Sequence, residues 1–126
     1  VVSAMMGETD RLLSLGRQIA NCDLENSEIQ QLLTNGENIS SALVALAISK
    51  RGYKAQSFNA WQANIRYEYE KNQISFDLDW GRSSLDEKII PIITGYQAIH
   101  ENRIVTLGRG GSDLTAIALS KKPSDL

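Results

Sequence analysis

The residues Ile89-Ile90-Pro91-Ile92-Ile93-Thr94 form a nearly continuous apolar run in a chain of 126 residues. A run without alternating polar side chains is typical of a strand that is buried on both faces of a parallel sheet. Pro91 cannot donate a ladder hydrogen bond, so it must lie early in the strand or where no such bond is needed. The run therefore predicts a central parallel strand, and such a strand requires helices on both faces of its sheet.

The segments on either side of this run alternate between helical and strand-like patterns. Apolar spacing predicts helices over 9–20, 39–50 and 112–121, a short helix from the Asn26-Ser27 cap to about 35–36, and another over 84–88. The helix 39–50 is apolar on nearly all sides, so we expect it to be buried. Strands are expected over 53–58, 65–69, 74–78 and 103–107, and Val1-Val2 reads as the end of another buried strand. This alternation predicts an α/β fold with a mainly parallel sheet.

Composition excludes several classes of protein. The chain has 13 Lys and Arg residues against 15 Asp and Glu residues and a pI near 5.4, so it lacks the basic surface of a nucleic-acid-binding protein. Its apolar runs stop far short of the roughly 20 residues that cross a membrane. The single Cys22 cannot form an internal disulfide, which favours a cytoplasmic location. His100 has no second His or Cys at metal-ligand spacing, so no metal site is expected.

The densest chemical signal is Thr106-Leu107-Gly108-Arg109-Gly110-Gly111-Ser112-Asp113, between a predicted strand and a predicted helix. Glycines let the backbone turn tightly and approach a ligand closely, and the start of a helix presents free N–H groups that suit an anion. Arg109 adds a guanidinium that can hold a carboxylate or phosphate by two bonds. Two interpretations stay open at this point: an anion site, or a sharp turn capped by Ser112 with Asp113 favouring the helix dipole.

Two other predicted turns carry polar side chains. Glu37, in Gly36-Glu37-Asn38, is either ordinary helix-start chemistry or a carboxylate that faces a cationic group of a substrate. Ser3 and Thr9 follow the first strand, where they either bond a ligand or, in the case of Thr9, cap the next helix. Ligands of open α/β sheets bind beyond the carboxyl ends of the strands, where we expect all three turns to meet.

These separated motifs together resemble aspartokinases. The resemblance rests on Val1-Val2-Ser3-Ala4-Met5 with Thr9-Asp10, on Gly36-Glu37 with Ser40, and on Thr106 to Asp113; Ser57 to Ala63 and Pro91 to Gln97 are similar to intervening elements of the same family. It covers essentially the whole chain. Met6, Asn64 and Ala98 stand where the family usually has glycine, and the hairpin over 65–79 is atypical.

The resemblance implies an amino acid kinase fold, a three-layer α/β/α sandwich with a mainly parallel sheet, incomplete here at both ends. It implies transfer of the γ-phosphoryl group of MgATP to the side-chain carboxylate of L-aspartate, giving 4-phospho-L-aspartate on the route to lysine, threonine and methionine. By analogy Arg109 holds the substrate α-carboxylate, Glu37 holds its ammonium group, and Asp113 orients the phosphoryl-transfer machinery. The remaining implied pocket residues are Ser3, Thr9, Gly110, Gly111 and Ser112.

The resemblance also implies what lies outside this chain. Residues 1–126 correspond to the central, aspartate-binding part of a kinase domain, without the catalytic-lysine element, most of the ATP-binding segment or the regulatory domains. We expect such a chain alone to be inactive and to associate with itself, and the complete enzyme to be a homo-oligomer such as a dimer. The alternative is a non-catalytic piece or scaffold that keeps the aspartate-binding core. A relative that uses glutamate, carbamate or a nucleotide is disfavoured by the pairing of Glu37 with Arg109.

Overall fold

The computed structural model describes residues 1–77, 79, 84 and 86–121. Three helices come first: α1 (Glu8–Ile19), α2 (Ser27–Leu33) and α3 (Asn35–Lys50). They are followed by β1 (Ala55–Phe58), β2 (Arg66–Glu68), the 3₁₀ turn η1 (Tyr69–Lys71), β3 (Gln73–Ser75), β4 (Ile90–Ile93), β5 (Gln97–His100), β6 (Arg103–Thr106) and α5 (Gly111–Ser120). The expected strand 74–78 and helix 84–88 include residues 78 and 85, which lie outside the described residues. None of the helices described is long and apolar enough to cross a membrane.

The predicted central strand is confirmed. β4 pairs with β1 in parallel, from Ala55 opposite Ile90 to Phe58 opposite Ile93. On its other side Val2 forms a parallel bridge, donating from its N–H to the Ile93 carbonyl at 2.9 Å and accepting from the Gly95 N–H at 2.9 Å. Pro91 is the second residue of β4, as its missing N–H requires. The first turn of the chain therefore begins beside the carboxyl end of β4.

A second group of strands has the order β3-β2-β5-β6. β2 and β5 are parallel, whereas the outer pairs β2–β3 and β5–β6 are antiparallel. β5 was not predicted, because its four residues Gln97-Ala98-Ile99-His100 hold only two apolar side chains and show no long apolar run. β5 is nevertheless almost wholly buried, and it carries the chain from the end of β4 to β6.

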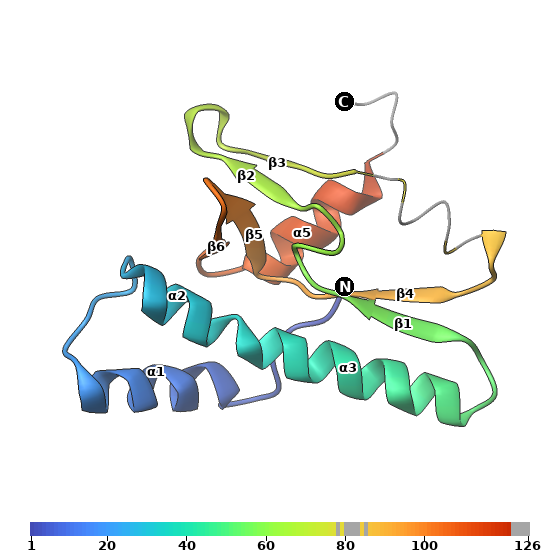
Figure 1. Ribbon diagram of the computed structural model, residues 1–126, viewed down its shortest axis with the longest axis horizontal. Helices are drawn as coiled ribbons and strands as arrows, with labels where there is room; N and C mark the ends of the chain where they lie inside the picture. The colour runs from blue at the N-terminus through green and yellow to red at the C-terminus, as the bar shows by residue number, and fades with distance from the viewer. Residues whose placement is uncertain (78, 80–83, 85, 122–126) are drawn as a thin grey trace.

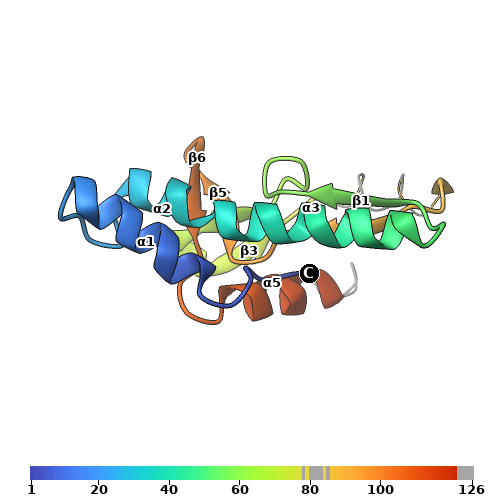
Figure 2. The ribbon, with the colours of Figure 1, turned by 90° about the horizontal axis from the view of Figure 1, so that it is seen from below.

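Helices lie on both sides of the strands, which confirms the expected α/β/α arrangement. α2 and α3 follow one another along one side, with α1 packed on α2, and α5 lies on the opposite side (Figures 1 and 2). The larger buried core, against which Leu119 of α5 packs, consists of Phe58, Ala60, Ala63, Ile65, Ile93, Ala98 and Ile99. A smaller cluster of Leu12, Ile29 and Leu33 joins α1 to α2.

Two predictions about α3 were wrong. The helix begins at Asn35 rather than near residue 39, because Thr34 keeps a right-handed helical backbone and α2 passes almost directly into α3. The helix is also not buried all round: Ile39, Leu43 and Leu46 are 41–67% exposed, on the side away from the strands. The first correction matters for function, because it places Glu37 inside the first turn of a helix.

Candidate functional site

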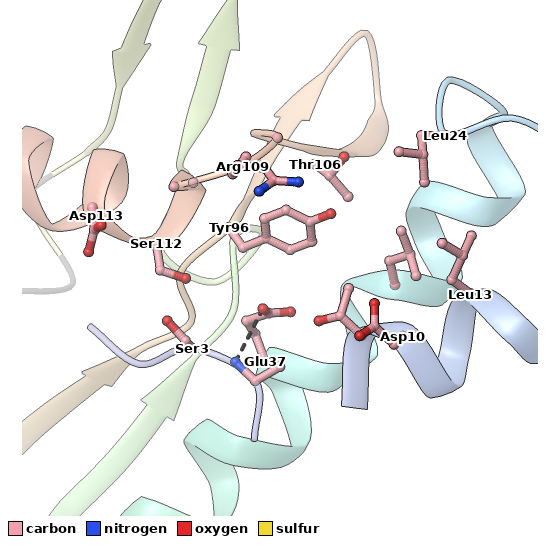
Figure 3. A pocket seen from close by; sticks show the side chains of 16 residues that line it. Ser3, Asp10, Leu13, Leu24, Glu37, Tyr96, Thr106, Arg109, Ser112 and Asp113 are labelled. Carbon is pink, nitrogen blue, oxygen red and sulfur yellow. Dashed lines mark hydrogen bonds between the residues drawn. The ribbon is translucent and has the colours of Figure 1, made fainter. Parts of the chain in front are cut away.

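A cavity of about 570 Å³ lies where the predicted turns converge. It is bounded by the segment before α1, the start of α3, the residue after Gly95 and the loop between β6 and α5 (Figure 3). Every residue predicted for the site lines this cavity: Ser3, Thr9, Glu37, Arg109, Gly110, Gly111, Ser112 and Asp113. The expectation that these turns meet is thus confirmed. Their expected position after parallel strands is not: Glu37 follows the helix α2, and Arg109 follows β6, which pairs antiparallel with β5.

Glu37 presents a buried carboxylate to the cavity. The residue is only 3% exposed, and its Oε1 accepts a hydrogen bond from the Ala4 N–H at 3.2 Å. Its Oε2 is buried and has no hydrogen-bond partner among the described residues. Burial raises the pKa of this carboxyl, while the Ala4 N–H acts in the opposite direction. An unpaired buried carboxylate oxygen costs free energy, so the arrangement favours a cationic ligand group as its partner.

Arg109 lies across the cavity in the glycine-rich loop. Gly108 and Gly110 take left-handed backbone angles, with φ of +73° and +74°, which only glycine adopts without strain. Arg109 is exposed, and no ion pair joins it to a carboxylate in the described part of the chain. Its guanidinium is therefore available for an anionic group, which supports the anion-site interpretation of this loop.

The start of α5 is not the turn capped by Ser112 that was one of the two interpretations of this loop. Gly110 is the N-cap, without a side-chain cap bond, and Ser112 is the second residue of the helix. The Gly111 N–H donates to the Gly108 carbonyl at 3.0 Å and the Leu114 N–H donates to the Gly110 carbonyl at 3.1 Å. The Ser112 and Asp113 N–H groups remain at the dipole-positive end of the helix, where an anion is favourable. Asp113 itself is exposed and lies beyond Ser112, away from Glu37 (Figure 3).

Thr9 also does not cap its helix. The N-cap of α1 is Gly7, which makes no side-chain cap bond, and Thr9 is the second helical residue. The cavity wall continues beyond it with Asp10, Leu13, Leu24 and Leu33. This wall has the exposed carboxylate of Asp10 and an apolar surface made by the three leucines. None of these four residues was predicted to belong to the site.

Tyr96 is a site residue that the sequence prediction missed. Its ring lies between Arg109 and Glu37 in the view of Figure 3, and its backbone has a φ of +70°, which is costly for a residue with a side chain. Burial is the main reason that the pKa of its phenol is raised; contact with Thr106 lowers it and the charge of Glu37 raises it. The available signal was its place directly after Thr94-Gly95, at the carboxyl end of the central strand.

Gly95 packs closely against Ser112 in the first turn of α5, at this end of the cavity. A Cβ at Gly95 would lie 2.6–2.8 Å from the Oγ, Cβ and Cα atoms of Ser112, and the backbone of α5 cannot move aside easily. We expect Gly95→Ala to lower the free energy of unfolding by about 1–3 kcal/mol, the cost of an overpacked site. Chemical denaturation measures this change.

Gly16→Ala is the matched control for Gly95→Ala. A Cβ at Gly16 would approach only the side-chain ends Ile29 Cδ1 at 2.6 Å and Leu32 Cδ2 at 3.2 Å, which can rotate away. Alanine also favours a helix interior over glycine by about 1 kcal/mol. Gly16→Ala should therefore cost less than Gly95→Ala; an equal or larger cost would contradict the close packing of Gly95 on α5.

The described residues contain no cluster of three or more His, Cys, Asp or Glu side chains that could hold a metal ion. What the cavity does offer is a buried carboxylate, a guanidinium, the start of α5 and the hydroxyl groups of Ser3, Thr9, Tyr96, Thr106 and Ser112. A cation site and an anion site in one cavity suit a small zwitterion with a further anionic group. Fold and cavity together are those of an α/β protein with a polar cavity that could hold a small ligand.

The chain belongs to the amino acid kinase family, whose model matches residues 1–122. It is 44% identical over 124 residues to an aspartokinase of Geobacillus stearothermophilus, covering 95% of this chain and 30% of that protein. It is 41% identical over 126 residues to an aspartokinase of Rickettsia prowazekii, covering 95% of this chain and 28% of that protein. The chain thus spans about 30% of the length of the relatives it matches.

Solved structures agree with this family. An aspartate kinase from Synechocystis superposes with a TM-score of 0.77 at 36% identity, covering 94% of this chain and 19% of that one. Aspartokinase III of E. coli, in complex with aspartate and ADP, superposes with a TM-score of 0.64 at 25% identity, covering 89% of this chain and 27% of that one. The amino acid kinase fold implied by the sequence motifs is therefore confirmed.

Proposed function

We propose that this chain is the central, aspartate-binding part of the kinase domain of an aspartate kinase. The observation that carries the proposal is the buried Glu37 carboxylate, whose Oε2 lacks a partner, in the same cavity as Arg109. In the proposed complex Glu37 binds the ammonium group of L-aspartate and Arg109 binds its α-carboxylate by two charged hydrogen bonds. Aspartokinase relatives over 95% of the chain, and a relative solved with aspartate and ADP, support this assignment.

The proposed reaction is phosphoryl transfer to the side-chain carboxylate of the bound aspartate. An oxygen of that carboxylate attacks the γ-phosphorus of ATP, the bond to the β,γ-bridging oxygen breaks, and ADP leaves with the electron pair. The attacking carboxylate is already ionised at neutral pH, so no general base is needed. Catalysis then consists of positioning the two reactants and stabilising charge.

The remaining residues have supporting roles in this proposal. Ser3, Thr9 and Ser112 supply hydroxyls, and the Gly110–Gly111 backbone lets the substrate approach closely. Asp113, in the first turn of α5 at the cavity edge, orients the phosphoryl-transfer machinery. Mg²⁺ would enter as part of MgATP and would neutralise charge on the phosphates during transfer.

The product, 4-phospho-L-aspartate, would serve lysine, threonine and methionine synthesis by the diaminopimelate route in the cytoplasm. We also propose that the complete kinase is a homo-oligomer such as a dimer. The exposed apolar residues Ile39, Leu43 and Leu46 on α3 support association of this part of the chain.

Ligand analogues test the two charge contacts separately. Succinate lacks the ammonium group of L-aspartate, and β-alanine lacks its α-carboxylate. Succinate leaves the buried Glu37 carboxylate unpaired, and β-alanine leaves the Arg109 guanidinium without its charged hydrogen bonds. We therefore expect either analogue to bind the complete kinase at least about thirtyfold more weakly than L-aspartate. Isothermal titration calorimetry measures the three affinities; equal affinity for succinate and L-aspartate would contradict the role of Glu37.

A further inference from the structure

Gln97 does not line the cavity, but it is buried next to the start of α3, and both ends of its amide make hydrogen bonds. It is 1% exposed, and its Oε1 accepts from the Ala60 N–H at 3.2 Å. Its Nε2 donates to the Thr34 carbonyl at 3.2 Å and to Asn38 Oδ1 at 3.1 Å. An amide offers one acceptor and two donors on its two ends, so this environment defines which end is which.

Two of the three partners of Gln97, Thr34 and Asn38, flank Glu37 in the sequence. Thr34 is the joint between α2 and α3, and Asn38 directly follows Glu37 in the first turn of α3. The Thr34 carbonyl also accepts from the Asn38 N–H at 3.3 Å, the first backbone bond of this turn. Thr34 makes no side-chain cap bond to α3, so Gln97 supplies from β5 a polar anchor that the helix start does not provide for itself.

The direction of the Glu37 side chain depends on how this turn is rotated. Successive residues of a helix point about 100° apart, so a small rotation or slide of the joint moves the Glu37 carboxylate along the cavity wall. Misplacement of a binding group by about 1 Å is enough to weaken its interaction severely. Resting on the proposed function, we infer that Gln97 is a positioning residue for aspartate binding, which aims Glu37 by holding the Thr34–Asn38 turn.

The test is substitution of Gln97 by Met, which has a similar length and no amide. In the complete kinase we expect Gln97→Met to raise KM for L-aspartate at least about tenfold, with kcat and KM for ATP changing less than about threefold. This split is expected because a contact made equally in the ground state and the transition state affects KM and leaves kcat unchanged. An unchanged KM for aspartate in the folded variant would overturn the inference.

A double-mutant cycle separates positioning of Glu37 from general destabilisation. If Gln97 acts through Glu37, then Gln97→Met should change aspartate affinity less than about twofold in a Glu37→Gln background. The same fold-change in both backgrounds would overturn the inference. Ile65→Val is the stability control, because Ile65 is 1% exposed in the core and does not line the cavity; it should leave KM for aspartate unchanged.

Asn38→Ala is the second variant if Gln97→Met does not fold. It removes one partner of Gln97 and keeps the bonds to Thr34 and Ala60. We therefore expect Asn38→Ala to raise KM for aspartate about threefold when Glu37 is present, and to leave it unchanged when Glu37 is replaced by Gln. No change when Glu37 is present would overturn the inference. If Glu37→Gln alone leaves aspartate affinity unchanged, the proposed function itself fails, which distinguishes the two outcomes.

Discussion

Arg109→Ala is expected to lower kcat/KM for L-aspartate at least about thirtyfold in the complete kinase, while KM for ATP stays nearly constant. The guanidinium is the cation that the cavity offers to the α-carboxylate, and loss of a charged hydrogen-bond partner costs about 2–5 kcal/mol. At about 1.4 kcal/mol per factor of ten, the lower bound of that range gives the expected change. Steady-state kinetics with each substrate varied in turn measure it.

Two further arginine variants make the result specific. Arg109→Lys keeps the charge and loses the planar fork, so its loss should lie between wild type and Arg109→Ala. Arg51→Ala removes a charge at the exposed end of α3, outside the cavity, and should change kcat/KM by less than a factor of about two. If Arg109 were only a solvated turn residue, Arg109→Ala would resemble Arg51→Ala.

Glu37→Gln is expected to weaken aspartate binding about thirtyfold to several thousandfold without weakening the fold at pH 7. The amide keeps an oxygen for the Ala4 N–H but removes the charge that faces the ammonium group. The binding loss follows from the same range of about 2–5 kcal/mol for an unpaired charge. Calorimetry measures the affinity, and Glu70→Gln, on the exposed η1 turn, is the control that should bind normally.

Stability should respond to pH in a defined direction. Burial raises the pKa of Glu37 above its ordinary value of 4.5, so the folded state keeps the proton after the unfolded state has released it. Between the two pKa values the unfolded state therefore binds fewer protons, and this group lowers the free energy of unfolding as pH rises. Glu37→Gln removes the titrating carboxyl and therefore this decrease in the free energy of unfolding. The variant should be at least as stable as wild type at pH 7. A variant clearly less stable than wild type at pH 7 would contradict the burial of an unpaired charge.

Much of the site could be predicted from sequence because its residues lie in recognisable turns or at helix starts. The glycines at 108, 110 and 111 indicate a tight turn, and the apolar run before Thr94 indicates the central strand to which the other turns must be close. Ser3 follows the Val2 bridge beside β4, Arg109 follows β6 and Glu37 begins α3, and the fold brings these three segments to one cavity.

The rest depends on long-range contacts that local patterns do not contain. The start of α3 was misplaced because nothing around Thr34 shows that its backbone stays helical, and Gln97 anchors it from β5. β5 was missed because its burial comes from neighbouring strands. The ring of Tyr96 reaches the cavity only through a left-handed backbone, which a tyrosine does not predict.

The bridge between Val2 and Thr94 has a consequence for how the protein folds. It joins residues that are far apart in sequence, so the entropy of closing this loop must be met before the contact forms. Val2 can dock only on a β4 edge that already exists, and Ala4, which donates to Glu37, lies two residues further on. We therefore expect the part of the cavity around Glu37 to form late in folding, after the strands next to it. We expect local opening of this segment to remove the Ala4 contact of Glu37 while the hydrophobic core stays folded.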